Sequence, residues 1–468
     1  MITKKIFTRN ISRLLCIASL PVLLLSSCDK YLDVQPKGKR LLKTVSDYNL
    51  WLNNYSSLEH SIPNEMLQLD DNIDDSRLTA SFSTTDSRVY TWQQQFNLDV
   101  AGPPVIWKDF YESIYYFNTV LLGIDEATGG TEQQKNSLKA EALLGRAFSY
   151  LYLVNLYGKQ YNAATADKDL SVPFVTSNDL NDATPPRSTV KEVYDHIITD
   201  IHSAIADLPK DNNQNRFRGA LPGAYSVLAR TYLYMGNFAK AGENAQLALD
   251  NGQNTILDFG TMSGPNGIPA AIIRPGAIYA RLVKQNFTQL TPTLSFLKSF
   301  NTKDQRLAFY YTNLGNFSFQ KRGETYHMGT GVFYSGAYPN CGTSVEEMRL
   351  ILAEVAARAN DLPKALNELH LLRKSRFKPA DYQRYESTVQ EEVLNRIFTE
   401  RTFEFAVNGM RWFDMRRLDS EGRMPAVNRY DGQGNLVATL PPHSNKYTLQ
   451  IPIQIMAFNP SWPQNPWE

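Results

Sequence analysis

The chain is poor in cysteine and has no marked excess of either charge. Its 468 residues include 3 cysteines, 48 lysines and arginines, and 47 aspartates and glutamates, which gives a formal net charge of +1. So few thiols exclude a disulfide framework as the main source of stability. The balanced charge argues against a nucleic-acid binder, whose footprint is a basic excess. Stability must therefore come from a packed core, which a chain of this length can build.

Sequence motifs of several enzyme classes are also missing. No histidine is followed by Glu-x-x-His, no cysteines are spaced as Cys-x-x-Cys, and no Gly-x-Ser-x-Gly elbow occurs. The glycine-rich segment 260–267 lacks the Lys-Ser/Thr of a phosphate-binding loop. We therefore expect no metal, no cofactor, and no activated thiol or serine.

The apolar run near the N-terminus is too short to span a membrane. Leu14–Leu25 is apolar with two interruptions, whereas a spanning helix needs about 20 apolar residues. The run follows a basic start and ends at Leu25–Cys28, which resembles a bacterial lipobox. We expect residues 1–27 to be a lipoprotein signal peptide, Cys28 to carry the lipid, and residues 28–40 to form a tether.

Removal of the signal peptide would change both the charge and the cysteine count. Residues 1–27 carry four basic residues and no acidic one, so the net charge of +1 would become −3. Cys16 would leave with the signal and Cys28 would be lipidated, so Cys341 would be the single remaining thiol. No internal disulfide is then expected, although the destination is oxidising.

A paired-helix repeat is the clearest periodic pattern. The large residues of segment 225–232 fall on one helical face, and Gly236–Asn237 then indicates a turn. Small residues line one side of the segment that follows, which lets two helices approach closely. The residues that carry this pattern are Tyr225, Leu228, Tyr232, Ala241, Ala245 and Ala248. Their spacing resembles a tetratricopeptide repeat.

Two further helix pairs are predicted elsewhere in the chain. Met348–Arg373 repeats the pattern more loosely, and Leu138–Tyr157 with Val190–Leu208 resembles a pair separated by a long connection. The residues placed at the turn and at the helix ends are Asn360, Asp361, Gly158, Ser188 and Thr189. Because a single repeat cannot bury its own face, we expect the pairs to stack into one block.

The predicted fold is mainly α, with two kinds of region in a single domain over residues 41–468. Residues 105–250 and 344–418 form the helical-pair scaffold. Residues 56–104 and 251–343 are rich in Gly, Pro, Asn, Ser and Thr and show little regular period. Long stretches of that kind inside a compact domain are usually functional, so we expect an irregular, loop-rich ligand-binding lobe.

Several ordered motifs resemble the SusD/RagB family of nutrient-binding lipoproteins. The strongest is Glu400–Arg417, which is similar to the family pattern Glu-Arg, then Glu, then Gly-x-Arg-Trp-x-Asp-Leu-x-Arg. Lys30–Gly38, Trp107–Leu122, Glu141–Gly158 and the closing segment 451–466 match as well. The resemblance spans the chain from the tether to the C-terminus, with a gap over residues 251–343.

This resemblance implies both a fold and a function. Family members combine tetratricopeptide-type helix pairs with an irregular lobe, and they sit on the outer membrane beside a SusC-like TonB-dependent transporter. They bind glycans, or peptides in some branches, and pass them on without cutting them. Two positions depart from the family pattern, because Ile455 replaces a frequent acidic residue and Trp467 replaces a usual glycine.

Two charged segments have both a chemical and a structural interpretation. Glu400 and Glu404 lie one helical turn apart, as paired catalytic carboxylates could, but with Arg401 they can equally form ion pairs within the helix. We favour the structural interpretation. Asp70 and Asp74 alternate as at the start of a calcium loop, yet the glycine and glutamate that complete an EF-hand are missing. A solvated acidic loop is the favoured interpretation, with a looser calcium site as the alternative.

Aromatic residues beside polar ones are the candidate sugar-binding groups, because a sugar presents apolar C–H faces ringed by hydroxyls. The best cluster is Tyr90–Asn97, where an extended backbone would put Tyr90 and Trp92 on one side. It also lies roughly where the resemblance places part of the family's ligand arc. The candidate residues are Arg77, Tyr90, Trp92, Asn97, Tyr279, Tyr326, Phe333 and Tyr334.

The leading hypothesis is a non-catalytic lipoprotein that binds an oligosaccharide or polysaccharide and delivers it to a TonB-dependent partner. One alternative keeps the fold and exchanges the ligand for a peptide or another nutrient. A second is a surface glycoside hydrolase, which would need two carboxylates about 5 to 10 Å apart in a cleft. A third is a structural assembly protein that uses its repeats to hold partners.

Overall fold

The structure, a computed structural model, describes most of the chain. The described ranges are 42–74, 82–284, 291–311, 319–322, 325–328, 340–406 and 408–468, with the backbone alone described for 319–322 and 325–328. Residues Thr44–Glu468 form one compact unit. None of the helices within these ranges is both long and apolar enough to span a membrane.

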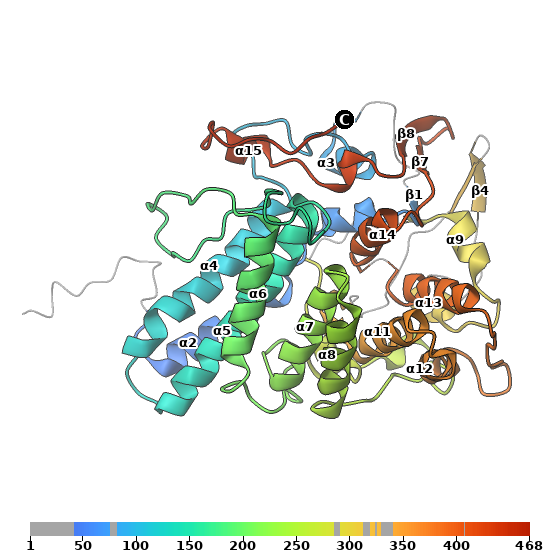
Figure 1. The fold of residues 1–468 in the computed structure, drawn as a ribbon, viewed down its shortest axis with the longest axis horizontal. Coiled ribbons are helices and arrows are strands. Elements are labelled where there is room, and N and C mark those ends of the chain that lie inside the picture. The colour runs from blue at the N-terminus through green and yellow to red at the C-terminus, as the bar shows by residue number, and fades with distance from the viewer. Residues whose placement is uncertain are drawn as a thin grey trace, which may run out of the picture. The chain divides into compact units, whose positions relative to one another are not determined.

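Helices dominate the compact unit (Figure 1). In chain order they are α2 (Val45–Trp51), α3 (Thr85–Tyr90), α4 (Trp107–Gly123), α5 (Glu132–Tyr157), α6 (Val190–Ala204), α7 (Leu221–Tyr234), α8 (Phe238–Asp250), α9 (Leu294–Ser299), α10 (Arg306–Tyr310), α11 (Val345–Arg358), α12 (Leu362–Arg373), α13 (Gln390–Glu404), α14 (Arg411–Ser420) and α15 (Ile453–Met456). Single 3-10 or π turns are η2 (Tyr55–Glu59), η3 (Asn64–Leu69), η4 (Ile124–Glu126), η5 (Pro265–Gly267), η6 (Ala271–Ile273), η8 (Lys374–Arg376) and η9 (Asn445–Tyr447).

The predicted repeat turns are present at both positions. Gly236 adopts a left-handed φ of 72°, and Asn237 caps α8 by accepting a hydrogen bond from the Lys240 amide. Asn360 adopts φ 61° and Asp361 caps α12 in the same way. Glycine and asparagine tolerate this backbone region better than other residues, which is why these two positions can reverse the chain.

Capping residues, and not the pattern of apolar residues, determine where the helices begin and end. Thr189 begins α6 and Gly158 ends α5, as predicted. However, α5 starts at Glu132, six residues before the predicted Leu138, because Thr131 forms a capping box there. The first turns of α5 are exposed and polar, so hydrophobic periodicity does not mark them. The N-terminal boundary was therefore predicted too late.

The helices pack in chain order into a layered scaffold. α4 packs on α5, α5 on α6, α7 on α8, and α11 on α12, while α8 contacts α11 across the two tetratricopeptide-like pairs. Small residues make the close approach within the α7–α8 pair, since Ala241, Ala245 and Ala248 are fully buried. The predicted stacking of helix pairs and the mainly α fold are confirmed.

The strands are few and short. They are β1 (Ile73–Asp74), β2 (Ala277–Tyr279), β3 (Thr291–Pro292), β4 (Phe319–Arg322), β5 (Thr325–Met328), β6 (Thr343–Ser344), β7 (Val427–Tyr430) and β8 (Leu436–Leu440). Each described strand pairs with one antiparallel partner, in the pairs β1–β3, β2–β6, β4–β5 and β7–β8. The β1–β3 register joins Ile73 to Pro292, so the two irregular regions of the sequence meet in space.

The C-terminal segment returns to the segment that follows α3, and both lie at the same side of the ribbon in Figure 1. The Gln95 side chain donates to the Ile451 carbonyl at 3.2 Å and accepts from the Ile453 amide at 2.9 Å. The Gln454 amide donates to the carbonyls of Asn97 and Asp99. The predicted ligand cluster is therefore shared between two parts of the chain that are far apart in sequence.

Candidate functional site

The two central rings of the predicted cluster lie in the core. Tyr90 is the last residue of α3 and Trp92 follows with a left-handed φ of 49°, so the segment is not extended as predicted. Each residue is only 1% exposed. The Arg429 guanidinium carbon lies 4.4 Å from the centre of each ring. The expectation that these rings form exposed stacking platforms is corrected, because both rings pack against Arg429 and the core, and Trp92 only lines a small depression from below its rim.

Arg429, from β7, holds the backbone around this cluster. Its guanidinium donates to the carbonyls of Tyr90 at 3.0 Å, Ile73 at 2.7 Å, Gln68 at 3.1 Å and Asp70 at 2.7 Å. Burial lowers the pKa of this guanidinium from its ordinary value. One cation therefore supplies donors to four backbone carbonyls, three in the segment 68–73 and one at the C-terminal end of α3.

The polar part of the cluster lies at the surface. Gln94 is exposed, and its amide donates to the Gln450 side chain at 3.3 Å. Asn97 is partly exposed, and its side chain donates to the Pro103 carbonyl at 3.1 Å and accepts from the Asp99 amide at 3.0 Å. These contacts shape the loop and leave amide groups at its outer edge.

A small depression joins this loop to the C-terminal segment. Its lining includes Gln94, Phe96, Asn97, Lys446 and Trp467, and its enclosed volume is about 10 Å³. The Lys446 ammonium lies 5.2 Å from the centre of the partly exposed Trp467 ring. We call the surface formed by these five residues the amide–indole surface. Its Trp467 was visible in the sequence only as a departure from the family pattern, and Lys446 gave no signal.

The remaining predicted residues fall into two groups. Tyr279 is 1% exposed in β2, with the Arg281 guanidinium carbon 3.9 Å from its ring centre, so the expectation of an open platform is corrected here too. The others have no described side chain. Cys28, Arg77, Phe333 and Tyr334 lie outside the described residues, and Tyr326 is described only as backbone in β5.

The acidic segment 70–74 is buried rather than solvated. Burial, with a smaller contribution from Asp71, raises the pKa of Asp70 to about 7. Asp71 forms a two-point ion pair with Arg411 at 2.8 and 2.6 Å, and Asp74 accepts from the Tyr90 hydroxyl at 3.2 Å. The solvated-loop interpretation is wrong because these groups have protein partners. Across the ranges that the structure describes, no cluster of three or more metal-ligating side chains occurs.

The paired glutamates of α13 are enclosed by arginines. Glu400 pairs with Arg306 and with Arg396, the latter at 2.7 Å. Glu404 pairs with Arg306 at 3.1 Å and with Arg376 at 2.6 Å. Burial raises the pKa of each carboxyl, but the arginines outweigh it and hold both pKa values below the ordinary range. The structure thus gives these side chains arginine partners from other elements as well as from their own helix.

Arg401 and the residues of α14 extend this network. Arg401 bonds Asp414 at 2.7 Å, and Arg417 bonds Glu354 of α11 at 2.7 and 2.9 Å. These bonds tie the last two helices of the scaffold to α11. Burial raises the pKa values of Glu354 and Asp414, but arginine neighbours outweigh it and lower both, so these ionised pairs join the helices and offer no acidic proton to a substrate.

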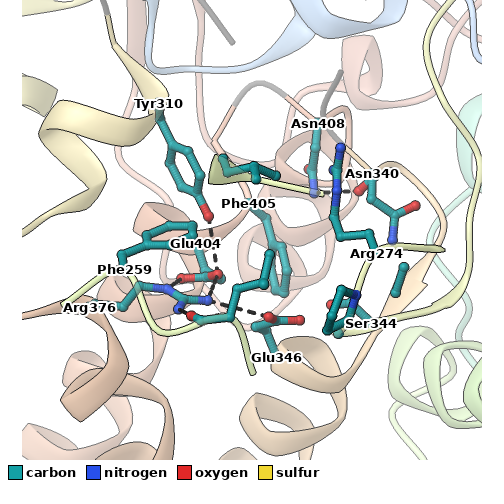
Figure 2. A pocket seen from close by; sticks show the side chains of 15 residues that line it. Phe259, Arg274, Tyr310, Asn340, Ser344, Glu346, Arg376, Glu404, Phe405 and Asn408 are labelled. Atoms are coloured by element: carbon teal, nitrogen blue, oxygen red, sulfur yellow. Dashed lines mark hydrogen bonds and ion pairs between the residues drawn. The ribbon is translucent and has the colours of Figure 1, made fainter. Parts of the chain in front are cut away.

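A pocket opens above one edge of the network. Figure 2 shows the paired Arg376 and Glu404 on one side of it and Arg274 on the other. The Tyr310 hydroxyl donates to Glu404 at 3.3 Å, and Arg376 lies 3.4 Å from Glu346. Burial raises the pKa of Glu346, and its arginine neighbour offsets only part of that effect. The enclosed volume is about 90 Å³.

The chain matches two family models. Residues 30–233 match a SusD-like model described as starch-binding and associating with the outer membrane. Residues 347–466 match the model of the SusD family. The first match ends within α7 and the second begins within α11, so α8, the region 251–343 and Trp467 lie outside both.

Two relatives are similar in sequence. SusD-like protein P2 of Formosa agariphila is 26% identical over 401 residues, which is 72% of this chain and 75% of the relative. A SusD-like protein of Bacteroides ovatus is 25% identical over 165 residues, which is 33% of this chain and 28% of that protein.

Solved structures share the fold. A SusD superfamily protein from Bacteroides thetaiotaomicron superposes with a TM-score of 0.70 at 20% identity, covering 90% of this chain and 100% of its own. A SusD-like carbohydrate binding protein from Bacteroides vulgatus superposes with a TM-score of 0.63 at 18% identity, covering 87% of this chain and 94% of its own. From the ordered motifs, the matched models and the shared fold, the chain belongs to the SusD/RagB family.

Proposed function

We propose that this protein is a non-catalytic, lipid-anchored binding protein of the outer membrane that captures an oligosaccharide or polysaccharide and delivers it to a SusC-like TonB-dependent transporter. The observation that carries the proposal is the family match over residues 30–233, whose model is described as starch-binding and associating with the outer membrane. The residues of the amide–indole surface supply chemistry that suits such a ligand.

The amide–indole surface has the two components that a sugar requires. Trp467 and Phe96 provide apolar ring surface for C–H faces, and the side chains of Gln94, Asn97 and Lys446 provide polar groups for hydroxyls. The depression encloses too little volume for a sugar ring, so an extended glycan would lie across its rim. We therefore assign first contact with the glycan to this surface.

The proposal that the ligand is bound and not cut is supported by the state of the glutamates. A glycoside hydrolase needs one carboxylic acid that gives up a proton and a second carboxylate free to act. Glu400 and Glu404 are both buried, ionised and bound to arginines. Two glutamates held ionised in this way have no proton to give to a leaving group.

The anchor and the partner are part of the same proposal. The lipobox-like ending at Cys28 and the family's outer-membrane description support lipidation. Cys28→Ala is expected to move the protein from the membrane to the soluble fraction, measured by fractionation and mass spectrometry of the N-terminus. Affinity purification of the wild-type protein from solubilised outer membranes is expected to bring down a TonB-dependent transporter. A membrane-bound Cys28→Ala variant contradicts the anchor, and purification without a transporter contradicts the partner.

The first experiment is calorimetry of residues 29–468 against a glycan panel, with chromatography of the glycan afterwards. Trp467→Ala is expected to weaken binding by about 2 kcal/mol, or about thirtyfold, because a stacked indole is lost. Trp462→Ala is the matched control, since that tryptophan lies in the same C-terminal segment but does not line the depression.

Each other outcome has a distinct meaning. Equal loss in both tryptophan variants moves the site away from the amide–indole surface. Binding to peptides and to no glycan would mean that the ligand is a peptide and that the glycan proposal is wrong. Shortened oligosaccharides in the chromatogram overturn the non-catalytic assignment.

A further inference from the structure

The pocket of Figure 2 is separate from the amide–indole surface. The two share no lining residue, and they are built from different elements. The pocket lies among the loop before β2, α10, the start of α11 and the end of α13, whereas the amide–indole surface joins the segment after α3 to the C-terminus. A ligand in the pocket would therefore be a second one, or a second part of the same chain.

The floor of the pocket is pre-organised. Arg376 binds Glu404 at two points, 2.9 and 2.6 Å, and its guanidinium carbon lies 4.4 Å from the centre of the Phe259 ring. It also donates to the Leu257 carbonyl at 2.6 Å. These side chains are buried and already bound to one another. Ligand binding therefore does not lose the conformational entropy that ordering mobile side chains would cost.

Glu346 is the acceptor that the pocket exposes to a ligand. Its carboxylate contacts Arg376, at 3.4 Å, the Ser344 hydroxyl and its own backbone amide, whereas a carboxylate has about four acceptor positions. Gly276 stands directly beside it with a left-handed φ of 88°, and a Cβ at that position would lie 2.9 Å from a Glu346 oxygen. Glycine thus keeps the space in front of the carboxylate open.

Elsewhere in the pocket lining, one side-chain amide can donate hydrogen bonds and two side chains are apolar. The Asn408 side-chain amide has two N–H groups, and its bond to the Asn340 carbonyl is long, at 3.5 Å. Phe405 and Ile268 supply apolar wall. Among the residues that the structure describes, the charged lining consists of Arg274, Arg376, Glu346 and Glu404, so their formal charges balance. An ammonium or a carboxylate from a ligand would upset this balance in a largely buried site, whereas a neutral ligand would not.

We propose that this pocket is a second ligand site that holds one ring of a neutral, polyhydroxylated ligand, with ring hydroxyls donating to Glu346 and accepting from Asn408. The enclosed volume of about 90 Å³ holds several waters, and so suits one ring at a chain end or branch but not an oligosaccharide. The ligand class rests on the proposed function; the location and the neutrality of the ligand rest on the pocket itself. An oligosaccharide would lie across the amide–indole surface, and a single ring would enter here.

The test uses residues 29–468 with methyl glycosides of neutral hexoses and pentoses as probes, read by saturation-transfer NMR and by calorimetric competition. Ile268→Trp fills the pocket from a partly exposed loop position without touching the ion pairs, and Glu346→Gln keeps the shape but weakens the acceptor. Both are expected to weaken glycoside binding at least tenfold. Glu243→Gln, at an exposed position of α8, is the matched control and is expected to bind as the wild type does. Circular dichroism melting verifies that each variant is folded.

The outcomes separate this inference from the proposed function. If long glycans bind but neither Ile268→Trp nor Glu346→Gln changes glycoside binding, the second site is refuted and the proposed function stands. If long glycans fail to bind while glycosides bind in an Ile268-dependent way, the proposed function fails and the pocket stands. Stronger competition by a charged probe, such as methylamine or acetate, than by the neutral glycosides also overturns the inference.

Discussion

Arg429 illustrates how a single side chain can replace a missing piece of secondary structure. It is 1% exposed, its guanidinium carbon lies 4.4 Å from the ring centres of Tyr90 and Trp92, and it bonds four backbone carbonyls from the segment 68–73 and the end of α3. A buried carbonyl without a donor costs free energy, so segments with this little backbone pairing need such a donor. The guanidinium has five N–H groups in a fixed plane, which lysine lacks.

Arg429→Met is therefore expected to lower the free energy of unfolding by roughly 3 kcal/mol or more, because several buried carbonyls lose their donor at once. Urea denaturation measures the change. Arg423→Met is the matched control, since Arg423 pairs with Glu391 at the surface and its loss is expected to cost less than about 1 kcal/mol. Similar costs in the two variants would show that the four carbonyls do not depend on Arg429.

The raised pKa of Asp70 makes stability depend on pH. Folding raises that pKa from 3.8 to about 7, mainly through burial. Between these values the folded state keeps a proton that the unfolded chain has lost. The folded state therefore binds more protons, and this group lowers the free energy of unfolding as pH rises from about 4 to about 7.

Asp70→Asn is expected to remove this dependence. Relative to the wild type, the variant gains stability as pH rises from 4 to 8, as measured by urea denaturation at several pH values. Asp250→Asn, at an exposed end of α8, serves as the control and is expected to follow the wild-type profile. If the stability of Asp70→Asn depends on pH as that of the wild type does, the group that binds the proton is not Asp70.

At the scale of elements, capping residues decide where the helices begin. The Thr189 hydroxyl accepts from the Glu192 amide at 3.2 Å, and the Glu192 carboxylate accepts from the Thr189 amide at 2.7 Å. Thr131 and Gln134 form the same box at the start of α5. These contacts are local, so a sequence carries them directly, and the boundary of α5 was predicted too late only because its box was not used.

Thr189→Ala is expected to cost about 1 kcal/mol of stability, because the first turn of α6 loses its side-chain acceptor. Thermal and urea unfolding both report the loss. Thr199→Ala changes the same residue type at an exposed position inside α6 and is expected to cost less than about 0.5 kcal/mol, since alanine favours helix. Equal effects at the two positions would mean that the cap contributes nothing.

The strands were not predicted, and their physics explains why. β1 pairs with β3 and β2 with β6 across long stretches of sequence, and each contributes only two or three residues. A strand of two or three residues is too short to show the alternation of apolar and polar residues that marks strands in a sequence. Such a segment is a strand only because it pairs with a partner strand far away in the sequence.

At the scale of the whole molecule, buried ion pairs join the helix layers. Arg230 of α7 binds Glu347 of α11 at 2.7 and 2.6 Å, and both side chains are almost fully buried. Arg146 of α5 binds Asp200 of α6 at 2.8 and 2.9 Å. Such pairs add little net stability over apolar packing, but breaking one leaves a buried charge without compensation.

Arg230→Met is accordingly expected to cost about 3 to 5 kcal/mol, and the double variant Arg230→Met with Glu347→Leu is expected to recover part of that loss. A double-mutant cycle by urea denaturation measures the coupling. Additive losses would mean that the two residues act independently and that the pair does not join α7 to α11.

The sequence alone determined the helix pairs, their turns at Gly236 and Asn360, and the family, because these depend on spacing within a few residues or on short ordered motifs. It also predicted a ligand-binding loop at Tyr90–Asn97, which stays a prediction. Only the tertiary structure decided that Trp92 is core while Gln94 is exposed, and that Trp467 lies beside that loop. Burial and pairing depend on which distant segments meet, and a local sequence pattern does not identify the distant partner of a contact.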